Sequence, residues 1–416
     1  MKPTLSKFKV KEELDIKENP VIPSMYTRSI LPQLEKELYT KENMVITGTR
    51  NVGKTTILKY LFDKVESSNK VFIDLENILN RRIFEEENYD AIWSHLQPLG
   101  INKDEKSYIF LDEVQTVSNI ASVVKYLSDH WDTKFFLTGS SSFYLRKLFS
   151  ESMSGRKLIF TIYPLTFEEF LIFKGVNRKV DDSFLKKASM KNTINYERLI
   201  PYYREYMGYG GFPRVVNEPN VYRKKLILEE IFTSYFEKDV RQLADFKNIN
   251  ILRDLILLLV PRVGQRFEIT KLASDLGVSR ETVYSHLSFL EQTYFISVIP
   301  RFSGIGKQIA GNKKLFLCDT GIANVLGKIS EDQLFEQSIF QNFRPSKKLQ
   351  FYNKKGGDEI DFIMDGKIAI ETKIQVSRND INHVKQRSES LTDIKEVFAI
   401  TLSYNEEKEV ILATAL

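Results

Sequence analysis

Short apolar runs alternate with amphipathic stretches over much of the N-terminal half of the chain. The apolar runs occupy residues 44–47, 71–74, 108–111, 135–138 and 158–163, with helix-like stretches between them. Strands that alternate with helices predict a parallel sheet with right-handed crossovers. We therefore expect an α/β domain over residues 43–165, preceded by a charged, proline-broken lead-in over residues 1–42.

The pattern changes after residue 165. Residues 166–250 are mostly helical in pattern and contain aromatic clusters and a Gly210-Gly211-Phe212-Pro213 break, which suggests a helical lid or linker. Residues 251–305 show two amphipathic helical segments around a glycine turn, which predicts a winged helix-turn-helix. Residues 306–416 return to short strands mixed with helices, so we expect a second α/β domain at the C-terminus.

Composition narrows the possible functions only a little. The chain has 60 Lys and Arg against 55 Asp and Glu, so its formal charge of +5 does not indicate a nucleic-acid partner by itself. Its single cysteine, Cys318, excludes internal disulfides, and the four histidines are too scattered for a Cys/His zinc site. Neither a signal peptide nor an apolar run long enough to cross a bilayer is found, so we expect a soluble, cytoplasmic protein without a membrane partner.

A phosphate-binding loop follows the first apolar run. The sequence from Gly48 to Thr55 fits G-x-x-x-x-G-K-[ST] and precedes an amphipathic helix, which is the context this motif requires. Glycines let backbone N–H groups surround phosphates, Lys54 reaches the β- and γ-phosphates, and the Thr55 hydroxyl binds Mg²⁺. We expect ATP and Mg²⁺ as cofactors. The predicted nucleotide-binding residues are Gly48, Thr49, Arg50, Asn51, Val52, Gly53, Lys54, Thr55 and Thr56.

Two carboxylates, Asp112 and Glu113, end the apolar run at 108–111. Ligands bind parallel sheets at the carboxyl ends of the strands. Asp112 is therefore predicted to hold Mg²⁺, and Glu113 to orient the attacking water and accept its proton. Two acids after a strand often form only a solvated turn, but their distance from the phosphate loop favours the catalytic interpretation.

Together with the strand end Thr138-Gly139-Ser140, these motifs resemble AAA-type ATPases of the archaeal-ATPase-like group. The resemblance implies that Ser140, or alternatively Thr138, hydrogen-bonds the γ-phosphate or the water. A hydroxyl-rich turn is the simpler alternative. The resemblance also implies an arginine finger at Arg156 that acts on a neighbouring subunit's ATP in a homo-oligomer, whereas a lone arginine before a strand is usually solvated or salt-bridged.

The glycine-turn segment at 269–290 has Ser279 placed as a helix N-cap. The second helix carries Arg280, Tyr284 and His286, which we predict to face phosphates or base edges of DNA. The alternative is a winged helix that only packs against the ATPase.

A predicted hairpin near the C-terminus carries Asp361 on its first strand and Glu371 and Lys373 on its second. The residues from Asp361 to Lys373 contain an Asp365-Gly366 turn and a Glu-x-Lys sequence, which resembles the PD-(D/E)XK restriction-endonuclease-like core. The resemblance implies that Asp361 and Glu371 bind Mg²⁺, that Glu336 adds a further acidic ligand, and that Lys373 helps to activate water. A solvated hairpin, or a degenerate nuclease fold kept for binding, remains the alternative.

The hairpin register tests this interpretation. A two-residue Asp365-Gly366 loop would place Asp361 and Glu371 on opposite faces of the sheet. A three-residue loop or a bulge would pair them on one face. Active nuclease chemistry therefore predicts the longer loop or the bulge.

The sequence as a whole predicts an ATPase that couples ATP hydrolysis to DNA binding and to metal-dependent cleavage by the C-terminal domain. One alternative is an ATP-dependent regulatory switch whose C-terminal domain only binds DNA or protein. Another is a signalling or defence ATPase whose output is protein assembly.

Overall fold

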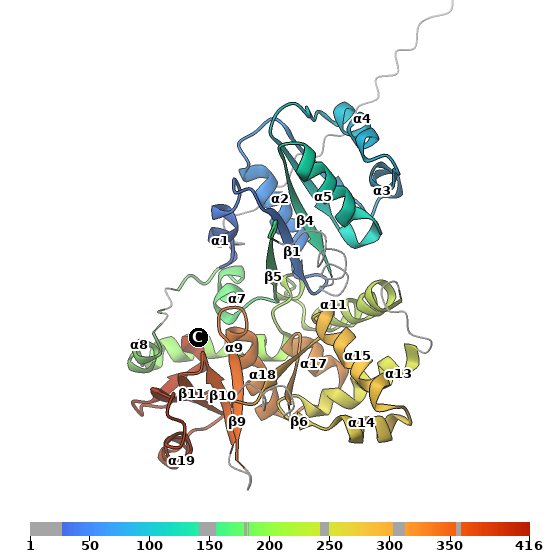
Figure 1. Ribbon diagram of the computed structural model, residues 1–416. Helices are drawn as coiled ribbons and strands as arrows, with labels where there is room; N and C mark the ends of the chain where they lie inside the picture. The colour runs from blue at the N-terminus through green and yellow to red at the C-terminus, as the bar shows by residue number, and fades with distance from the viewer. Residues whose placement is uncertain are drawn as a thin grey trace, which may run out of the picture.

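The computed structural model describes residues 27–140, 155–178, 181, 183–241, 249–302, 313–354 and 359–416. Most of the predicted lead-in, residues 1–26, lies outside them. An N-terminal α/β domain occupies the top of Figure 1, and helices and two further sheets form the lower half. None of the described helices combines the length and apolar character needed to span a bilayer.

The N-terminal domain is built on a parallel five-stranded sheet with strand order β2-β3-β4-β1-β5. Central strands are buried on both faces, which explains their continuous apolar runs. The predicted α/β core is therefore confirmed. The strands are β1 (Asn43–Gly48), β2 (Lys70–Asp74), β3 (Ser107–Asp112), β4 (Thr133–Gly139) and β5 (Lys157–Ile162).

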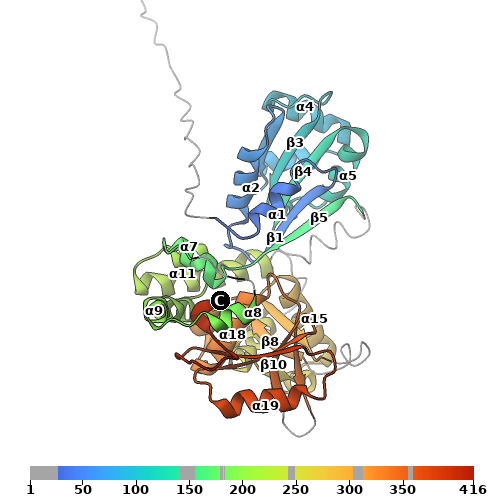
Figure 2. The same cartoon turned by 90° about the vertical axis from the view of Figure 1, so that its left-hand side faces the viewer.

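Helices cover both faces of this sheet (Figures 1 and 2). Met44 and Ile46 of β1 pack with α1 and α2, whereas Val45 between them packs with α3, α4 and α5 on the other face. This alternation follows from the two-residue period of a strand. The helices are α1 (Leu31–Lys36), α2 (Lys54–Lys64), α3 (Ile78–Phe84), α4 (Ile92–Leu96) and α5 (Ile120–His130), with short turns η2 (Tyr89–Ala91), η3 (Gln97–Leu99) and η4 (Val114–Thr116).

A helical segment leads away from the sheet, as predicted for the lid. Its core is aromatic: the rings of Phe167 and Tyr203 have centroids 4.7 Å apart in an edge-on arrangement. The segment ends in η5, a π-helical turn that continues α11. Its elements are α7 (Phe167–Phe173), α8 (Phe184–Ser189), α9 (Thr193–Tyr209), α10 (Pro213–Val216), α11 (Val221–Ser234) and η5 (Tyr235–Val240).

The glycine pair of the lid permits close packing against the C-terminal half. A Cβ atom on Gly210 would lie 1.8 Å from a carboxylate oxygen of Asp319, and one on Gly211 would lie 2.4 Å from the Leu165 carbonyl oxygen. The Gly211 N–H donates to Asp319 at 2.7 Å. Only glycine fits at these two positions, so the break is a docking point as well as a turn.

Three helices and a small antiparallel sheet, with strand order β6-β8-β7, follow the lid. The strand at residues 313–317 pairs with β7, so this unit extends past the expected boundary at residue 305. A local apolar pattern does not show which strand it will pair with, and the sequence therefore placed the boundary too early. The elements are α13 (Ile249–Leu259), η6 (Val260–Arg262), β6 (Arg266–Phe267), α14 (Ile269–Leu276), α15 (Arg280–Gln292), β7 (Ile296–Pro300) and β8 (Lys313–Leu317).

The last unit is a mixed sheet with strand order β13-β12-β11-β10-β9. Phe362 packs on the side of α18 and Ile363 on the side of α19, so the helices cover opposite faces. Its elements are α17 (Thr320–Leu326), α18 (Glu331–Phe343), β9 (Leu349–Asn353), β10 (Glu359–Met364), β11 (Ile368–Lys373), α19 (Arg378–Ser388), β12 (Glu396–Thr401), β13 (Val410–Leu412) and η7 (Ala413–Ala415).

The β10–β11 hairpin has the longer of the two predicted loops. Met364 pairs with Ile368, which leaves a three-residue loop from Asp365 to Lys367. The paired residues run from Phe362 with Ile370 to Met364 with Ile368, so this register continued by one residue would set Asp361 opposite Glu371. The Thr372 N–H donates to the Asp361 carboxylate at 2.8 Å. The structure therefore has the longer loop, and not the two-residue loop.

Candidate functional site

The phosphate loop joins β1 to α2 at the carboxyl edge of the parallel sheet. Its backbone has positive φ at Gly48 (142°), Asn51 (66°) and Gly53 (95°). A Cβ atom on Gly48 would lie 2.0 Å from the carbonyl oxygen of Ile162, so this strand end must be glycine. The loop therefore has the tight, side-chain-free path that phosphate oxygens require.

Lys54 lies inside this loop. Its Nζ donates to the carbonyl oxygens of Gly48 at 3.0 Å and Thr49 at 3.1 Å, and the residue is 4% exposed. Burial lowers the pKa of Lys54, and the carboxylate of Glu113 opposes that shift. The ammonium is thus held at the mouth of the loop, where it can bind an incoming anion.

Asp112 is the last residue of β3 and Glu113 follows it, and Thr138 of the neighbouring β4 positions both. The Thr138 hydroxyl donates to Asp112, and the Glu113 N–H donates to the Thr138 oxygen at 3.0 Å. Burial raises the pKa of Asp112, while hydrogen bonds from Thr138 and Thr55 oppose the shift. Thr55 and Asp112 are thereby brought together, as the sequence predicts for a Mg²⁺ site.

Glu113 has an unusual backbone. Its φ of 55° lies in the left-handed region, which non-glycine residues rarely adopt outside sites that demand it. The amide of Gln115 donates to the Glu113 carboxylate and, at 3.2 Å, to the Ser140 hydroxyl. Thr138 therefore hydrogen-bonds to both acids. Ser140 lies on the other side of Gln115 from Glu113, at what is called here the front of the site.

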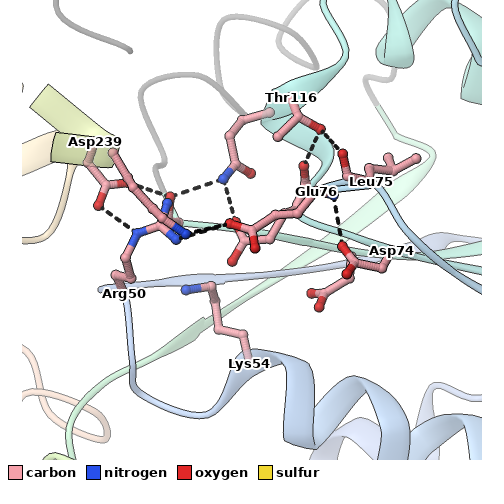
Figure 3. Close-up of polar contacts among 12 residues, drawn as sticks. Arg50, Lys54, Asp74, Leu75, Glu76, Thr116 and Asp239 are labelled. Carbon is pink, nitrogen blue, oxygen red and sulfur yellow. Dashed lines mark hydrogen bonds and ion pairs between the residues drawn. The ribbon is translucent and has the colours of Figure 1, made fainter. Parts of the chain in front are cut away.

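Asp239, which the sequence analysis missed, lies at the front of this site. Its two oxygens accept from the Ser140 hydroxyl at 2.5 Å and from Arg50 Nε at 3.1 Å, and the residue is 2% exposed. Figure 3 shows Asp239 facing Arg50 above Lys54. Burial raises the pKa of Asp239, and Arg50 opposes the shift. No motif marks this residue, which lies in a helical segment 189 positions beyond Arg50.

A second contact joins η5 to the edge of the sheet. Glu76, just after β2, accepts from Lys238 Nζ at 2.9 Å and lies 3.7 Å from Arg50 Nη1. The hydrogen bond from Lys238 lowers the pKa of Glu76. Because the Glu76 and Lys238 side chains are nearly half exposed, this contact is weaker than the buried Arg50–Asp239 pair.

A cavity of about 540 Å³ opens beside the phosphate loop. Arg28 forms part of its wall and donates to the Val52 carbonyl at 3.0 Å and to Glu169 at 3.1 Å, which ties α7 to the loop. This cavity could not be predicted from sequence patterns, because its wall combines four segments that lie far apart in the chain. Its lining residues are Thr27, Arg28, Leu31, Pro32, Glu35, Val52, Gly53, Thr56, Ile57, Tyr60, Phe173, Pro213 and Asn217.

Two parts of the chain match known protein families. Residues 40–171 match the family described as AAA domain. This segment contains the parallel sheet and the phosphate loop, and the match supports an AAA-type P-loop ATPase fold for it. Residues 200–333 match a domain of unknown function, DUF8612, which begins within α9 and ends within α18.

Two curated proteins are similar to this chain over most of its length. The chain is 28% identical over 394 residues to an uncharacterized protein of Methanocaldococcus jannaschii, covering 90% of this chain and 85% of the relative. It is 27% identical to an uncharacterized protein of Haemophilus influenzae, covering 88% and 90%. Among solved structures, the Walker-type ATPase of Pyrococcus abyssi shows 14% identity and a TM-score of 0.46, covering 72% of this chain and 95% of that one. The ORC2 protein of Aeropyrum pernix shows 14% identity and a TM-score of 0.35, covering 72% and 94%.

Arg156 lies at the opposite edge of the AAA domain's sheet. It precedes β5, whose first residue pairs with Asn43, whereas the phosphate loop begins at Gly48 beside Ile162. At roughly 3.3 Å per residue, a strand length of about 15–20 Å separates Arg156 from the loop. Its half-exposed side chain pairs with Asp129 of α5. It is therefore too far away to act on the nucleotide of its own subunit.

The predicted DNA-facing residues of α15 divide into two groups. Arg280 and Tyr284 are exposed, with Tyr284 at 60%. His286 is only 5% exposed, and its Nδ1 lies 2.7 Å from the Thr282 carbonyl oxygen. Burial lowers its pKa. The prediction for His286 is wrong because the residue lies beside the apolar stripe of the helix, so it cannot reach a groove.

The structure brings the predicted C-terminal acids together but places a lysine among them. Lys314 Nζ lies 2.6 Å from Glu336 Oε1 and 3.3 Å from Asp361 Oδ1. Lys373 points elsewhere and pairs with Asp380 of α19. Across the described residues, no three His, Cys, Asp or Glu side chains are arranged to hold a metal ion. Of the three predicted metal ligands, Glu336 and Asp361 thus pair with Lys314, whereas Glu371 lies 3.9 Å from Arg387.

Proposed function

We propose that the protein is a Mg²⁺-dependent ATPase in which binding of ATP is transmitted to the helical lid through Asp239. The observation that carries this proposal is the buried Asp239 carboxylate, which lies between Arg50 of the phosphate loop and Ser140. A lid residue thereby occupies the front of a nucleotide site.

The residues of the AAA domain fit Mg²⁺ and ATP. The glycine path and the Lys54 ammonium suit phosphates, and the oxygens of Thr55 and Asp112 are the hard donors that Mg²⁺ prefers. The cavity beside Thr56 lies where the nucleoside would extend from the loop. When bound, Mg²⁺ supplies charge neutralisation for phosphoryl transfer.

Glu113 is the proposed base. Its backbone is fixed by Thr138, so its carboxylate keeps a set direction at the front of the site. The Gln115 side-chain amide donates hydrogen bonds to this carboxylate and to the Ser140 hydroxyl. A proton acceptor and a hydroxyl therefore lie on either side of one amide. Such an arrangement can orient a water molecule and take its proton.

Asp239 competes with the nucleotide for the same partners. A phosphate that contacts Arg50 or Ser140 would meet a carboxylate already bonded to both. Two like unit charges 4 Å apart repel by about 4 kcal/mol at an effective dielectric constant of 20. We infer that γ-phosphate binding displaces Asp239, releases η5 from the loop and reorients the lid. This favours the regulatory-switch alternative raised by the sequence.

The first prediction concerns the catalytic residues. Glu113→Gln is expected to bind ATP but to lower hydrolysis at least about 100-fold, since a general base contributes that much or more. Lys54→Ala is expected to weaken nucleotide binding itself. Nucleotide titration and phosphate release measure the two effects, with the exposed Lys186→Ala as a control. Normal turnover in Glu113→Gln would remove the role assigned to it.

The second prediction concerns the lid contact. Asp239→Asn removes the competing charge and keeps the shape, so ATP affinity is expected to rise about tenfold, or roughly 1.4 kcal/mol. The matched control is Glu237→Gln on the same turn, whose carboxylate forms an exposed pair with Arg241. Weaker ATP binding in Asp239→Asn would show instead that Asp239 helps to hold the nucleotide.

The third prediction concerns assembly. Because Arg156 is remote from its own phosphate loop, we propose that it serves a neighbouring subunit in a homo-oligomer. Arg156→Ala subunits mixed with wild type are then expected to depress ATPase activity more than simple dilution does. Size-exclusion chromatography with ATP reports whether assemblies form. A strictly proportional loss of activity would indicate that subunits hydrolyse ATP independently.

A second candidate function is DNA binding by α15, which is favoured by the exposure of Arg280 and Tyr284. Arg280→Ala with Tyr284→Ala is expected to weaken binding of labelled duplex DNA at least about tenfold in anisotropy titrations, with a smaller salt dependence. Arg223→Ala, on the exposed face of the lid, is the control. Equal binding by both variants would exclude α15 as the contact.

A further inference from the structure

Three carboxylates near the C-terminal hairpin, those of Glu336, Glu359 and Asp361, surround Lys314. We propose that the ammonium group of Lys314 takes the place of a divalent cation in this nuclease-like domain. Glu336, Glu359 and Asp361 then fasten the C-terminal sheet to β8 and do not bind a metal.

The geometry around Lys314 is that of a filled cation site. Its Nζ lies 2.6 Å from Glu336, 2.8 Å from Glu359 and 3.3 Å from Asp361. The residue is 1% exposed. A buried ammonium requires this kind of pairing, because an unpaired charge in the interior costs several kcal/mol.

The oxygens of Asp361 have further partners, whereas Glu371 Oε2 is buried without a hydrogen bond to any described residue. Asp361 Oδ2 accepts from the N–H of Thr372 at 2.8 Å and from its hydroxyl at 2.9 Å, and Oδ1 faces Lys314. Glu371 lies 3.9 Å from the guanidinium of Arg387. Mg²⁺ demands oxygen ligands at about 2.0–2.1 Å in octahedral geometry. That arrangement cannot form around a point already occupied by an ammonium group.

Lys314 is anchored by its strand. Its backbone pairs with Ile299 of β7 and Arg266 of β6, so it lies on the central strand of the three-stranded sheet. Arg266 Nε approaches Glu359 at 3.7 Å from the same sheet. A Cβ atom on Gly264 would lie 2.6 Å from Glu336 Oε2, so the backbone closes over the cluster. Expelling the ammonium would therefore require movement of a paired strand.

The cluster thus joins two units. Lys314 comes from β8, Glu336 from α18, and Glu359 and Asp361 from β10. The positions that resemble nuclease ligands hold the small antiparallel sheet against the C-terminal mixed sheet. Movement of the unit containing α13–α15 would then carry the C-terminal sheet with it.

Manganese-dependent stability of the full chain, without nucleotide, tests this inference. Wild type and Asp361→Asn are expected to show the same change in melting temperature on addition of Mn²⁺, because neither has a metal site at the cluster. Lys314→Ala is expected to melt about 5–15 °C below wild type, since it leaves buried carboxylates without their counter-ion. Mn²⁺ is expected to restore part of that loss.

Two controls separate the possible outcomes. Glu336→Gln added to Lys314→Ala should abolish the restoration, because it removes a ligand of the new site. If Lys314→Ala does not fold, Lys314→Met with Glu336→Gln removes charge from both partners and provides a folded comparison. Calorimetric Mn²⁺ binding by wild type that disappears in Asp361→Asn would overturn the proposal. DNA cleavage by wild type that disappears in the same variant would also overturn it.

Discussion

The buried pair of Arg50 and Asp239 is the contact on which the proposed coupling between the phosphate loop and the lid depends. Arg50 belongs to the phosphate loop and Asp239 to the end of the lid, and both are nearly closed to solvent. A buried ion pair adds little net stability compared with apolar packing, but removing one partner is costly. Such a pair is therefore suited to a switch, because an anion that takes over one partner changes the position of the other.

The need of a buried charge for an opposite charge also explains the cluster around Lys314. Carboxylates gathered away from water require a cation, and the chain provides one from a neighbouring sheet through Lys314. In the N-terminal domain, the buried Asp112 instead accepts hydrogen bonds from Thr138 and Thr55 beside the phosphate loop. We therefore propose that similar residue types bind nucleotide in one half and join two sheets in the other.

The parts of the fold that depend on local sequence could be predicted. The phosphate loop, the acids after β3 and the alternation of strands and helices follow from short-range patterns, and the structure has them where they were expected. The hairpin loop was reduced to two alternatives, and the structure has the three-residue loop from Asp365 to Lys367. Each of these features is decided by residues close together in the chain.

The parts that depend on tertiary contacts could not be predicted. Asp239 and Lys314 carry no motif, and their importance arises only when distant elements bring opposite charges together. His286 has the spacing of a helix face, but which side of α15 is covered depends on its neighbours. The pairing of β8 with β7, and the cavity beside the phosphate loop, likewise arise from segments far apart in sequence.

The most direct test of the account is amide hydrogen exchange in η5, residues 235–240, measured for Glu113→Gln with and without ATP. This variant is expected to hold ATP without hydrolysing it, so the bound state persists during the measurement. If the γ-phosphate displaces Asp239, exchange in η5 should increase with ATP and remain at its nucleotide-free level with ADP. Equal protection of η5 in all three states would contradict the proposed coupling between nucleotide and lid.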